Sequence, residues 1–316
     1  MATVETDKRV GGSGYLEGIA MMTCGVMLLP VMDTIARYLA TQQAMAPGQI
    51  TFYRFFLQMV LTVPAFWWMG GLAAMRPQRL WLNLLRGTLL GAASLFFFTA
   101  LKYIPVADSI AIFFVEPFIL TALSALVLKE KVGWRRWLAI AIGFLGAIIV
   151  INPSFDRFGA IAFLPLATAT LFATYMLMNR ALGKVDTALV MQLVAGAGGS
   201  ILVGAVLVFG GVIGGVANLE PSLPHGALAV FLLLVLGLVS SYGHLIVVKA
   251  FQRTPASLLA PFQYLEIVSA ALLGYLVFAE FPDPSKLFGM AIIISSGLFI
   301  VWRENHLRKA ARNSAN

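Results

Sequence analysis

The chain has 316 residues, of which 60% are hydrophobic and 11% charged, and its formal net charge at pH 7 is +8. Average soluble domains are about 45–50% apolar and about 25% charged, so this composition excludes an ordinary soluble protein and indicates that lipid covers much of the surface. The single cysteine, Cys24, excludes an internal disulfide framework and a cysteine-based zinc site. The cationic residues lie at the ends of apolar runs and form no basic face, so we expect no nucleic acid partner. We also expect no metal and no cofactor.

Apolar runs long enough to cross a bilayer follow one another along the chain. The first run is too long for the core of a signal peptide and no cleavage pattern follows it, so we expect it to remain as a membrane helix. About 20 largely apolar residues cross the hydrocarbon core. On that measure the chain is all-α, with ten expected spans at 15–40, 49–70, 81–102, 106–128, 134–151, 158–180, 187–212, 226–249, 256–279 and 285–303.

The positive charges alternate between the two ends of these spans. Lysine and arginine are concentrated on the N-terminal tail, on every second connection after it and on the C-terminal tail. The opposite side has only Lys102, Arg157 and Lys286. The positive-inside rule therefore predicts a multi-pass protein of the cell inner membrane with both termini in the cytoplasm.

The sequence repeats with an offset of 150 residues. Glu116 falls on Glu266 and Pro105 on Pro255, and small residues repeat upstream of them where helices can pack closely. Each half would hold five spans, an odd number, so the halves should enter the membrane from opposite sides, as in many secondary transporters. The expected division is a tail at 1–14, a first repeat at 15–152, a second repeat at 153–303 and a tail at 304–316.

Several short segments resemble the EamA domain of the drug/metabolite transporter superfamily. They are 100–108 (ALKYIPVAD), Pro117, the pair Lys129-Glu130 and the glycine-bearing helix after it, with a second copy running from 250 through Glu280 to Gly297. The resemblance implies a carrier of five plus five helices with a central cavity, coupled to an ion gradient or to exchange. The segments 260–264 and 278–283 are similar to a branch that includes riboflavin and S-adenosylmethionine carriers. The second half departs from the first because Ile267 stands where Pro117 has its equivalent.

Glu116 and Glu266 are the strongest candidates for function. Both fall near the middle of an expected span, where a charged carboxylate costs about 2.5–3.5 kcal/mol on insertion scales. Such a carboxyl either holds a proton or pairs with a cation, so we expect proton coupling or recognition of a cationic substrate. The alternative is a permanently protonated glutamate that hydrogen-bonds a neighbouring helix.

Charged residues of the first three spans form a second group. Asp33 and Arg37 are spaced i, i+4 and should neutralise each other, and Arg54 lies within reach of a partner such as Asp33. These three residues have two possible roles. They form either an outer gate or a contact for an anionic group of the substrate, or they form a structural ion pair that holds two helices together. Arg86 should extend to the cytoplasmic surface, and the repeated pair Glu130 and Glu280 should be solvated charges at helix ends.

The expected cavity is lined by aromatic and amide side chains. Polar atoms are disfavoured against lipid, so tyrosines and glutamine in the spans should face the interior, and phenylalanines near Glu116 would stack on planar solutes. The predicted lining residues are Phe97, Phe113, Tyr175, Tyr242, Gln263 and Tyr264.

The sequence also has weak features of two other classes of protein, an enzyme and a channel. Ser200 with His244 faintly resembles an intramembrane serine hydrolase, but the glycine expected after the serine is missing and Ser200 fits a packing ladder with Gly196 and Gly204. A passive channel would favour rings of like polar residues. We therefore expect a secondary transporter and no enzyme. Riboflavin is the first-choice substrate, and S-adenosylmethionine, amino acids and drugs remain alternatives.

Overall fold

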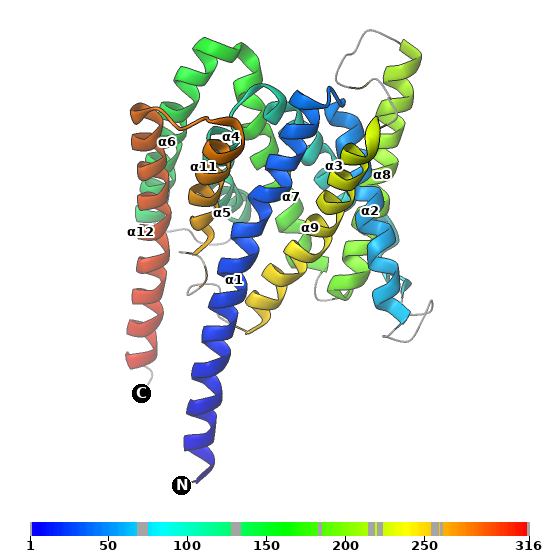
Figure 1. Cartoon of the computed structure of the whole chain (residues 1–316). Helices are drawn as coiled ribbons and strands as arrows, with labels where there is room; N and C mark the ends of the chain where they lie inside the picture. The colour runs from blue at the N-terminus through cyan, green and yellow to red at the C-terminus, as the bar shows by residue number, and fades with distance from the viewer. Residues whose placement is uncertain are drawn as a thin grey trace.

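The computed structural model describes the backbone of residues 2–67, 75–127, 134–182, 185–213, 219, 224–253, 259 and 262–314, and this part of the chain contains helices, turns and no strand. Figure 1 shows a bundle of long helices with both chain ends at the same end of the bundle. The helices are α1 (Ala2–Gln42), α2 (Pro47–Trp67), α3 (Leu80–Tyr103), α4 (Val106–Phe113), α5 (Glu116–Val127), α6 (Trp134–Phe158), η2 (Gly159–Phe163), α7 (Leu164–Leu182), α8 (Ala188–Ile213), α9 (Gly226–Arg253), α11 (Leu265–Phe278) and α12 (Pro284–Ser314).

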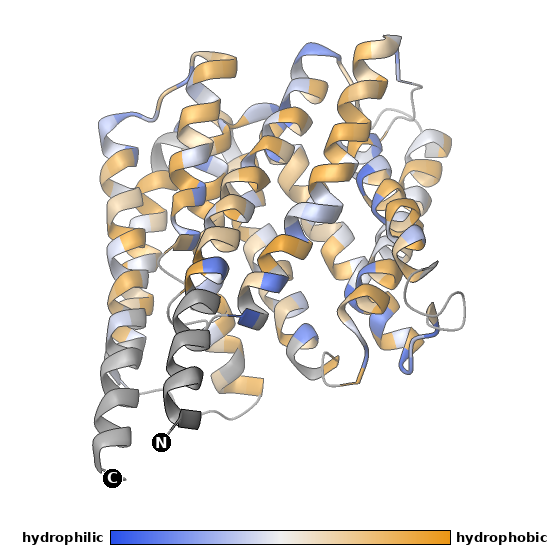
Figure 2. Cartoon of the chain, turned by 60° about the horizontal axis from the view of Figure 1, so that its bottom comes forward, coloured by the Kyte–Doolittle hydropathy of each residue, from blue (hydrophilic) through white to orange (hydrophobic). Residues whose placement is uncertain are grey.

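The helices are suited to lipid surroundings. Among the described residues, six helical stretches are long and apolar enough to cross a membrane, and three shorter helices are also apolar. Large apolar side chains such as Val212, Phe209 and Leu276 are exposed on the outside of the bundle. In Figure 2 hydrophobic residues run along the helices, while hydrophilic residues gather mostly at the ends and connections. The chain is therefore a multi-pass membrane protein.

Two of the expected spans are interrupted. The span expected at 106–128 is divided into α4 and α5, with Phe114 and Val115 in a turn between them. In the second half, Tyr264 is in a turn immediately before α11 begins at Leu265. These breaks correct the expectation of continuous helices, and they fall at equivalent positions, since 114 and 264 differ by the repeat offset of 150.

Contacts between the halves occur in exchanged pairs. α1 packs on α9 and α7 packs on α3; α3 packs on α8 and α9 packs on α2; α1 packs on α11 and α7 packs on α5. In the repeat, α1 corresponds to α7, α2 to α8, α3 to α9 and α5 to α11. Replacing every helix by its equivalent therefore turns the first contact of each pair into the second. The halves are therefore related by an approximate two-fold axis.

The α6–α12 contact follows the same rule in detail. A Cβ added at Gly146 would lie 2.9 Å from the Gly289 carbonyl oxygen, so the helices touch there. The Ser296 hydroxyl donates to the Ala139 carbonyl at 2.5 Å. Adding 150 to Gly146 and Ala139 gives Ser296 and Gly289, so these two contacts are one contact and its symmetry mate. The axis therefore passes between α6 and α12.

Candidate functional site

The interrupted helices meet on the approximate two-fold axis. The rings of Phe114 and Tyr264 contact each other with centroids 5.3 Å apart. Two residues that are exchanged by a two-fold axis can touch each other only near that axis. Tyr264 is held behind this contact by Gly297, where an added Cβ would lie 1.4 Å from the tyrosine hydroxyl oxygen. The two breaks thus lie against each other at the centre of the molecule.

Each break is followed by a glutamate in the first turn of the next helix. Glu116 begins α5, and Glu266 is the second residue of α11. The first turn of a helix carries unpaired backbone N–H groups and a partial positive charge, which favours acidic side chains. Interrupted helices whose ends face a central site are a recurring feature of secondary transporters.

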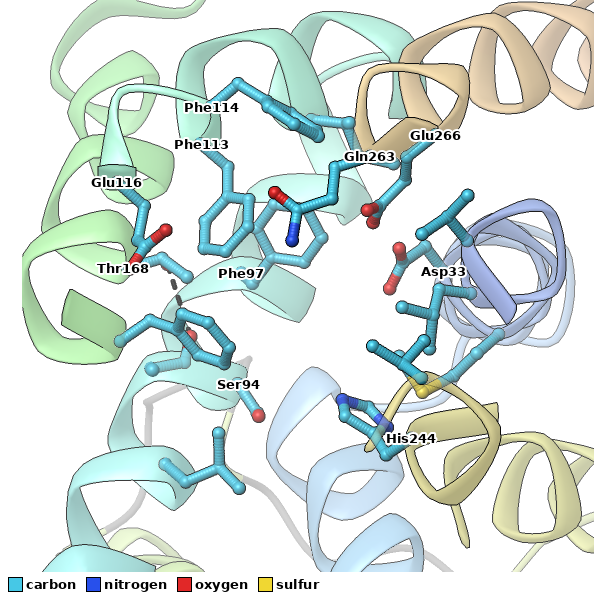
Figure 3. Close-up of a pocket in the computed structure, with 18 of the residues that line it drawn as sticks. Asp33, Ser94, Phe97, Phe113, Phe114, Glu116, Thr168, His244, Gln263 and Glu266 are labelled. Carbon is cyan, nitrogen blue, oxygen red and sulfur yellow. Dashed lines mark hydrogen bonds between the residues drawn. The ribbon is translucent and has the colours of Figure 1, made fainter. Parts of the chain in front are cut away.

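A pocket lies beside this junction (Figure 3). Its walls enclose about 1100 Å³ of empty space, its opening included. α1, α2, α3, α7, α9 and the two interrupted helices contribute to the walls, which are mostly apolar. The lining residues are Met22, Val26, Leu29, Met32, Asp33, Arg54, Leu90, Ala93, Ser94, Phe97, Ile110, Phe113, Phe114, Glu116, Pro117, Thr168, Phe172, Met176, His244, Val247, Gln263 and Glu266.

Among the described residues, three carboxyl groups face this pocket. Asp33 is only 4% exposed, and its side chain points toward that of Glu266, with which it interacts electrostatically (Figure 3). Glu116 lies on the opposite side of the pocket, and its Oε1 is buried without a hydrogen-bond partner in the described part of the chain. The two repeated glutamates therefore share one pocket without touching.

Arg54 brings a positive charge to the pocket wall. Its side chain is fixed by hydrogen bonds from Nη1 to Ser94 Oγ at 2.5 Å and from Nε to Ser240 Oγ at 3.1 Å. The guanidinium also lies over the rings of Phe55 and Phe98, 5.1 and 5.6 Å from their centroids. The Ser240 carbonyl is hydrogen-bonded to His244 Nδ1 at 2.9 Å. Arg54 thus reaches the pocket as a rigidly held guanidinium.

The predicted lining residues divide into two groups. Phe97, Phe113 and Gln263 line the pocket together with the two glutamates. Tyr175 lies behind the wall and contacts Phe172, a lining residue, at 5.4 Å between centroids. Tyr264 is buried at the axis behind Phe114 and does not line the pocket.

Tyr242 is a clear error of the sequence reasoning. Its side chain is 50% exposed on the outside of the bundle, whereas His244 on the same helix lines the pocket. Two residues apart on a helix are about 200° apart around its axis, so only one of them can face inward. The rotation of α9 about its axis decides which side chain faces the pocket, and the polarity of the Tyr242 hydroxyl does not.

The expected pairing of Asp33 with Arg37 is also wrong. Arg37 instead forms an ion pair with Glu280 at 2.7 Å and donates to the Ile104 carbonyl. Glu280 is therefore not a simple solvated charge, whereas its repeat partner Glu130 lies outside the described residues. Asp33 turns into the pocket, and Arg37, one turn further on, reaches the connection that precedes α12.

Sequence reasoning missed a second buried ion pair nearby. Lys286 Nζ lies 2.5 Å from Asp108 Oδ2, and the two residues are only 5% and 1% exposed. The signal was present, because Asp108 is an acidic residue within an apolar segment and Lys286 is one of the few cations expected at that end. Together with Arg37–Glu280, this pair forms what we call the far-end clamp, at the end opposite the termini (Figure 1).

The pocket lies on the side of the far-end clamp that is nearer the chain termini. α1 lines it from Met22 to Asp33, whereas Arg37, one turn further from the N-terminus, belongs to the clamp. The pocket therefore extends toward the end that carries the termini.

Arg86 does not extend to the surface as expected. It is 2% exposed and donates to Asn179 Oδ1 at 2.5 Å, to the Tyr175 hydroxyl at 3.3 Å and to the Met191 carbonyl. This bonding joins α3 to α7 and α8, so Arg86 has a buried structural contact.

The Ser200 region has the geometry of helix packing. The Ser200 hydroxyl donates to the Gly196 carbonyl at 2.7 Å within α8. A Cβ added at Gly196 would lie 3.0 Å from Met59 of α2. These contacts agree with the packing interpretation.

Comparisons with known proteins agree with this architecture. A family model described as the EamA-like transporter family matches residues 16–152 and, again, residues 157–302. The chain is 26% identical to a S-adenosylmethionine uptake transporter of Rickettsia prowazekii, over 92% of this chain and 94% of that protein. The corresponding protein of Rickettsia felis is 29% identical, over 92% and 94%. A riboflavin transporter of Vibrio cholerae is 27% identical, over 95% and 98%.

A solved structure described only as "Crystal structure of protein" has the same fold. It superposes with a TM-score of 0.58 at 18% identity, covering 90% of this chain and 96% of the other.

Proposed function

Because the chain belongs to the EamA-like transporter family, it is a membrane transporter of a small metabolite, and we propose that it carries S-adenosylmethionine by alternating access. The observation that carries this choice is the charge of the pocket. Asp33, Glu116 and Glu266 face it with Arg54 as the fixed counter-charge, so acidic groups are in excess. A pocket of this kind favours a substrate with net positive charge.

S-adenosylmethionine matches the pocket in several ways. Its sulfonium and ammonium groups are two positive charges for the carboxyls, and its adenine is a planar ring for the aromatic wall. Phe113 contacts Phe97 and Phe172 with centroids 5.8 and 5.4 Å apart, which makes a continuous aromatic surface. Names of relatives support the same substrate.

Riboflavin is the second candidate. The aromatic surface would stack on its flavin ring, and the relative from Vibrio cholerae has a similar degree of identity. Riboflavin is uncharged, however, and gives the buried carboxyls no cation. The pocket therefore favours the sulfonium compound over the first choice made from the sequence.

The proposed membrane arrangement has ten spans in the inner membrane, with both termini in the cytoplasm. Two family matches, each covering one half, support two five-span repeats at 15–152 and 153–303, and the position of both chain ends at one end of the bundle supports an even number of crossings. In this arrangement the far-end clamp faces away from the cytoplasm. We assign the described conformation as one in which the pocket is accessible from the cytoplasmic side.

We further propose that Glu116 and Glu266 couple transport to protons or to substrate charge. Each is a carboxyl at the first turn of an interrupted helix, in a pocket shared by both halves. Movement of the halves about the axis would change the exposure of both groups together. A carboxyl of this kind can take up a proton or a cationic substrate on one side and release it on the other.

Uptake into proteoliposomes tests the proposal. Purified protein is reconstituted, and the initial uptake of labelled S-adenosylmethionine and of labelled riboflavin is measured over a range of concentrations. We expect saturable uptake of S-adenosylmethionine that Glu266→Gln impairs and Glu17→Gln leaves unchanged, because Glu17 is an exposed residue paired with Arg253. Saturable uptake of riboflavin alone would transfer the assignment to the second candidate. Absence of uptake of both would contradict the proposal.

A further inference from the structure

We infer that the pocket recognises the two opposite charges of an α-amino acid group, with Arg54 binding the carboxylate and Asp33 the ammonium. This inference rests on the proposed function and deepens it, because it states which part of the substrate is recognised and which residues bind it. Its basis is an oppositely charged pair that lines one pocket without forming an ion pair.

Arg54 is prepared for an anion. It is 5% exposed, and its hydrogen bonds within the described residues go from Nε and Nη1 to serine hydroxyls, leaving Nη2 without a partner there. Serine carries no charge, so these two hydrogen bonds do not neutralise the buried guanidinium. A buried charge is costly unless an opposite charge compensates it, and a planar guanidinium matches a carboxylate better than any other side chain does.

Asp33 is the complementary group. It is 4% exposed and lines the pocket, and in the described part of the chain it makes neither a hydrogen bond nor an ion pair. Glu266 lies beside it and strengthens the local negative potential (Figure 3). An ammonium donates three hydrogen bonds, and it would find acceptors in these carboxyls and in the amide oxygen of Gln263, which also lines the pocket.

The separation of Asp33 and Arg54 is the decisive feature. The two residues attract each other electrostatically, yet no ion pair joins them. A pair that served only to neutralise itself would close to contact, as Lys286 and Asp108 do at 2.5 Å. Both side chains face the pocket instead, so a ligand that carries an ammonium and a carboxylate on the same carbon would complete the pair.

The aromatic side chains and Glu116 are then left to bind other parts of the substrate. With the amino acid group held between Asp33 and Arg54, the aromatic surface of Phe97 and Phe113 is left for a planar ring. Glu116, across the pocket from Asp33 in Figure 3, is left for a second positive charge such as a sulfonium. Riboflavin has neither an ammonium nor a carboxylate, so it would leave Arg54 and Asp33 unpaired.

A panel of competitors on the unaltered protein tests the inference. Uptake of labelled S-adenosylmethionine is measured against three unlabelled analogues: S-adenosylhomocysteine, which keeps the amino acid group and lacks the sulfonium; decarboxylated S-adenosylmethionine, which lacks the carboxylate; and methylthioadenosine, which lacks the whole amino acid group and the sulfonium charge. Loss of one partner of a buried charge pair weakens binding by about tenfold or more. We therefore expect the last two analogues to compete at least about tenfold more weakly than S-adenosylmethionine.

The variant Arg54→Gln assigns the effect to its residue. It should weaken competition by S-adenosylmethionine and remove most of its advantage over the decarboxylated analogue. Arg253→Gln is the matched control, because Arg253 is exposed and bonded to Glu17 away from the pocket. If Arg54→Gln fails to fold, the panel on the unaltered protein still decides the matter.

The outcomes separate the two proposals. Equal competition by S-adenosylmethionine and its decarboxylated analogue would overturn the inference and leave the transport assignment intact. Saturable uptake of riboflavin that no amino-acid-bearing compound inhibits would overturn the inference and the choice of substrate. No uptake of any compound would contradict the proposed function, and the inference with it.

Discussion

Neutralising Asp108 tests whether the far-end clamp holds one end of the pocket closed. Asp108→Asn preserves the size of the side chain but leaves the Lys286 ammonium, 5% exposed, without its partner at 2.5 Å. Removing one member of a buried ion pair costs about 3–5 kcal/mol. Asp283 is 3.9 Å from Lys286 and its side chain is 71% exposed, so it offsets part of this cost and the lower value applies.

The cost falls only on the conformation that buries the pair. About 3 kcal/mol corresponds to a change of about a hundredfold in the ratio of the two conformations. If opening at this end gives Lys286 access to water, Asp108→Asn should favour the opened state by that factor. The double variant Asp108→Asn with Lys286→Met removes both charges and should recover most of the closed state.

Thiol labelling measures this ratio. Ser109, fully buried next to Asp108, is replaced by cysteine in a Cys24→Ser background, and a water-soluble thiol reagent is applied from the far end. We expect labelling up to about a hundredfold faster with Asp108→Asn, and slow labelling again in the double variant. Unfolding temperatures in detergent identify variants that have lost their fold. Unchanged labelling of a folded Asp108→Asn protein would refute the reasoning.

Three further predictions concern coupling, packing and catalysis. Glu116→Gln and Glu266→Gln should each abolish the accumulation that a pH gradient drives while exchange persists; gradient-driven accumulation in both variants would disprove their coupling role. Gly91→Leu should destabilise the protein by about 1–3 kcal/mol, seen as a lower unfolding temperature in detergent, because an added Cβ would lie 2.9 Å from the Gly199 backbone; an unchanged temperature would show that α3 and α8 separate easily. Ser200→Ala should leave uptake unchanged, and loss of uptake in a folded variant would revive a chemical role for the serine.

The general architecture was accessible from the sequence because the membrane restricts what an apolar chain can form. Long apolar runs must become helices in lipid, and the expected spans agree with the helices to within a few residues at many of their ends. The repeat also predicted which helices are equivalent. The exchanged contacts, such as α1 with α9 and α7 with α3, follow from that equivalence.

The helix breaks were not accessible in the same way. Pro117 lies within the first turn of α5, where proline is tolerated, and it has no proline counterpart in the second half. The second half has Ile267 at that position and is interrupted as well. The breaks coincide with the packing of Phe114 against Tyr264 at the axis, a contact between halves that no local pattern reveals.

Charged and polar partners were the least predictable feature. Spacing along α1 suggested that Arg37 would pair with Asp33, but Glu280 is far away in the sequence and near in space. Tyr242 was assigned to the cavity by its polarity alone, and the rotation of α9 turns it outward. Helix rotation is set by interlocking residues on several neighbours, and only the assembled bundle contains that information.

The central claim is that one pocket, shared by two symmetry-related halves, carries a solute by alternating access. Counterflow tests it most directly: proteoliposomes are preloaded with unlabelled S-adenosylmethionine and diluted into a trace of the labelled compound. We predict that label accumulates transiently inside above its external concentration, because a carrier exchanges one molecule for another. Label that only equilibrates, at a rate proportional to concentration and indifferent to the preloaded compound, would contradict the account.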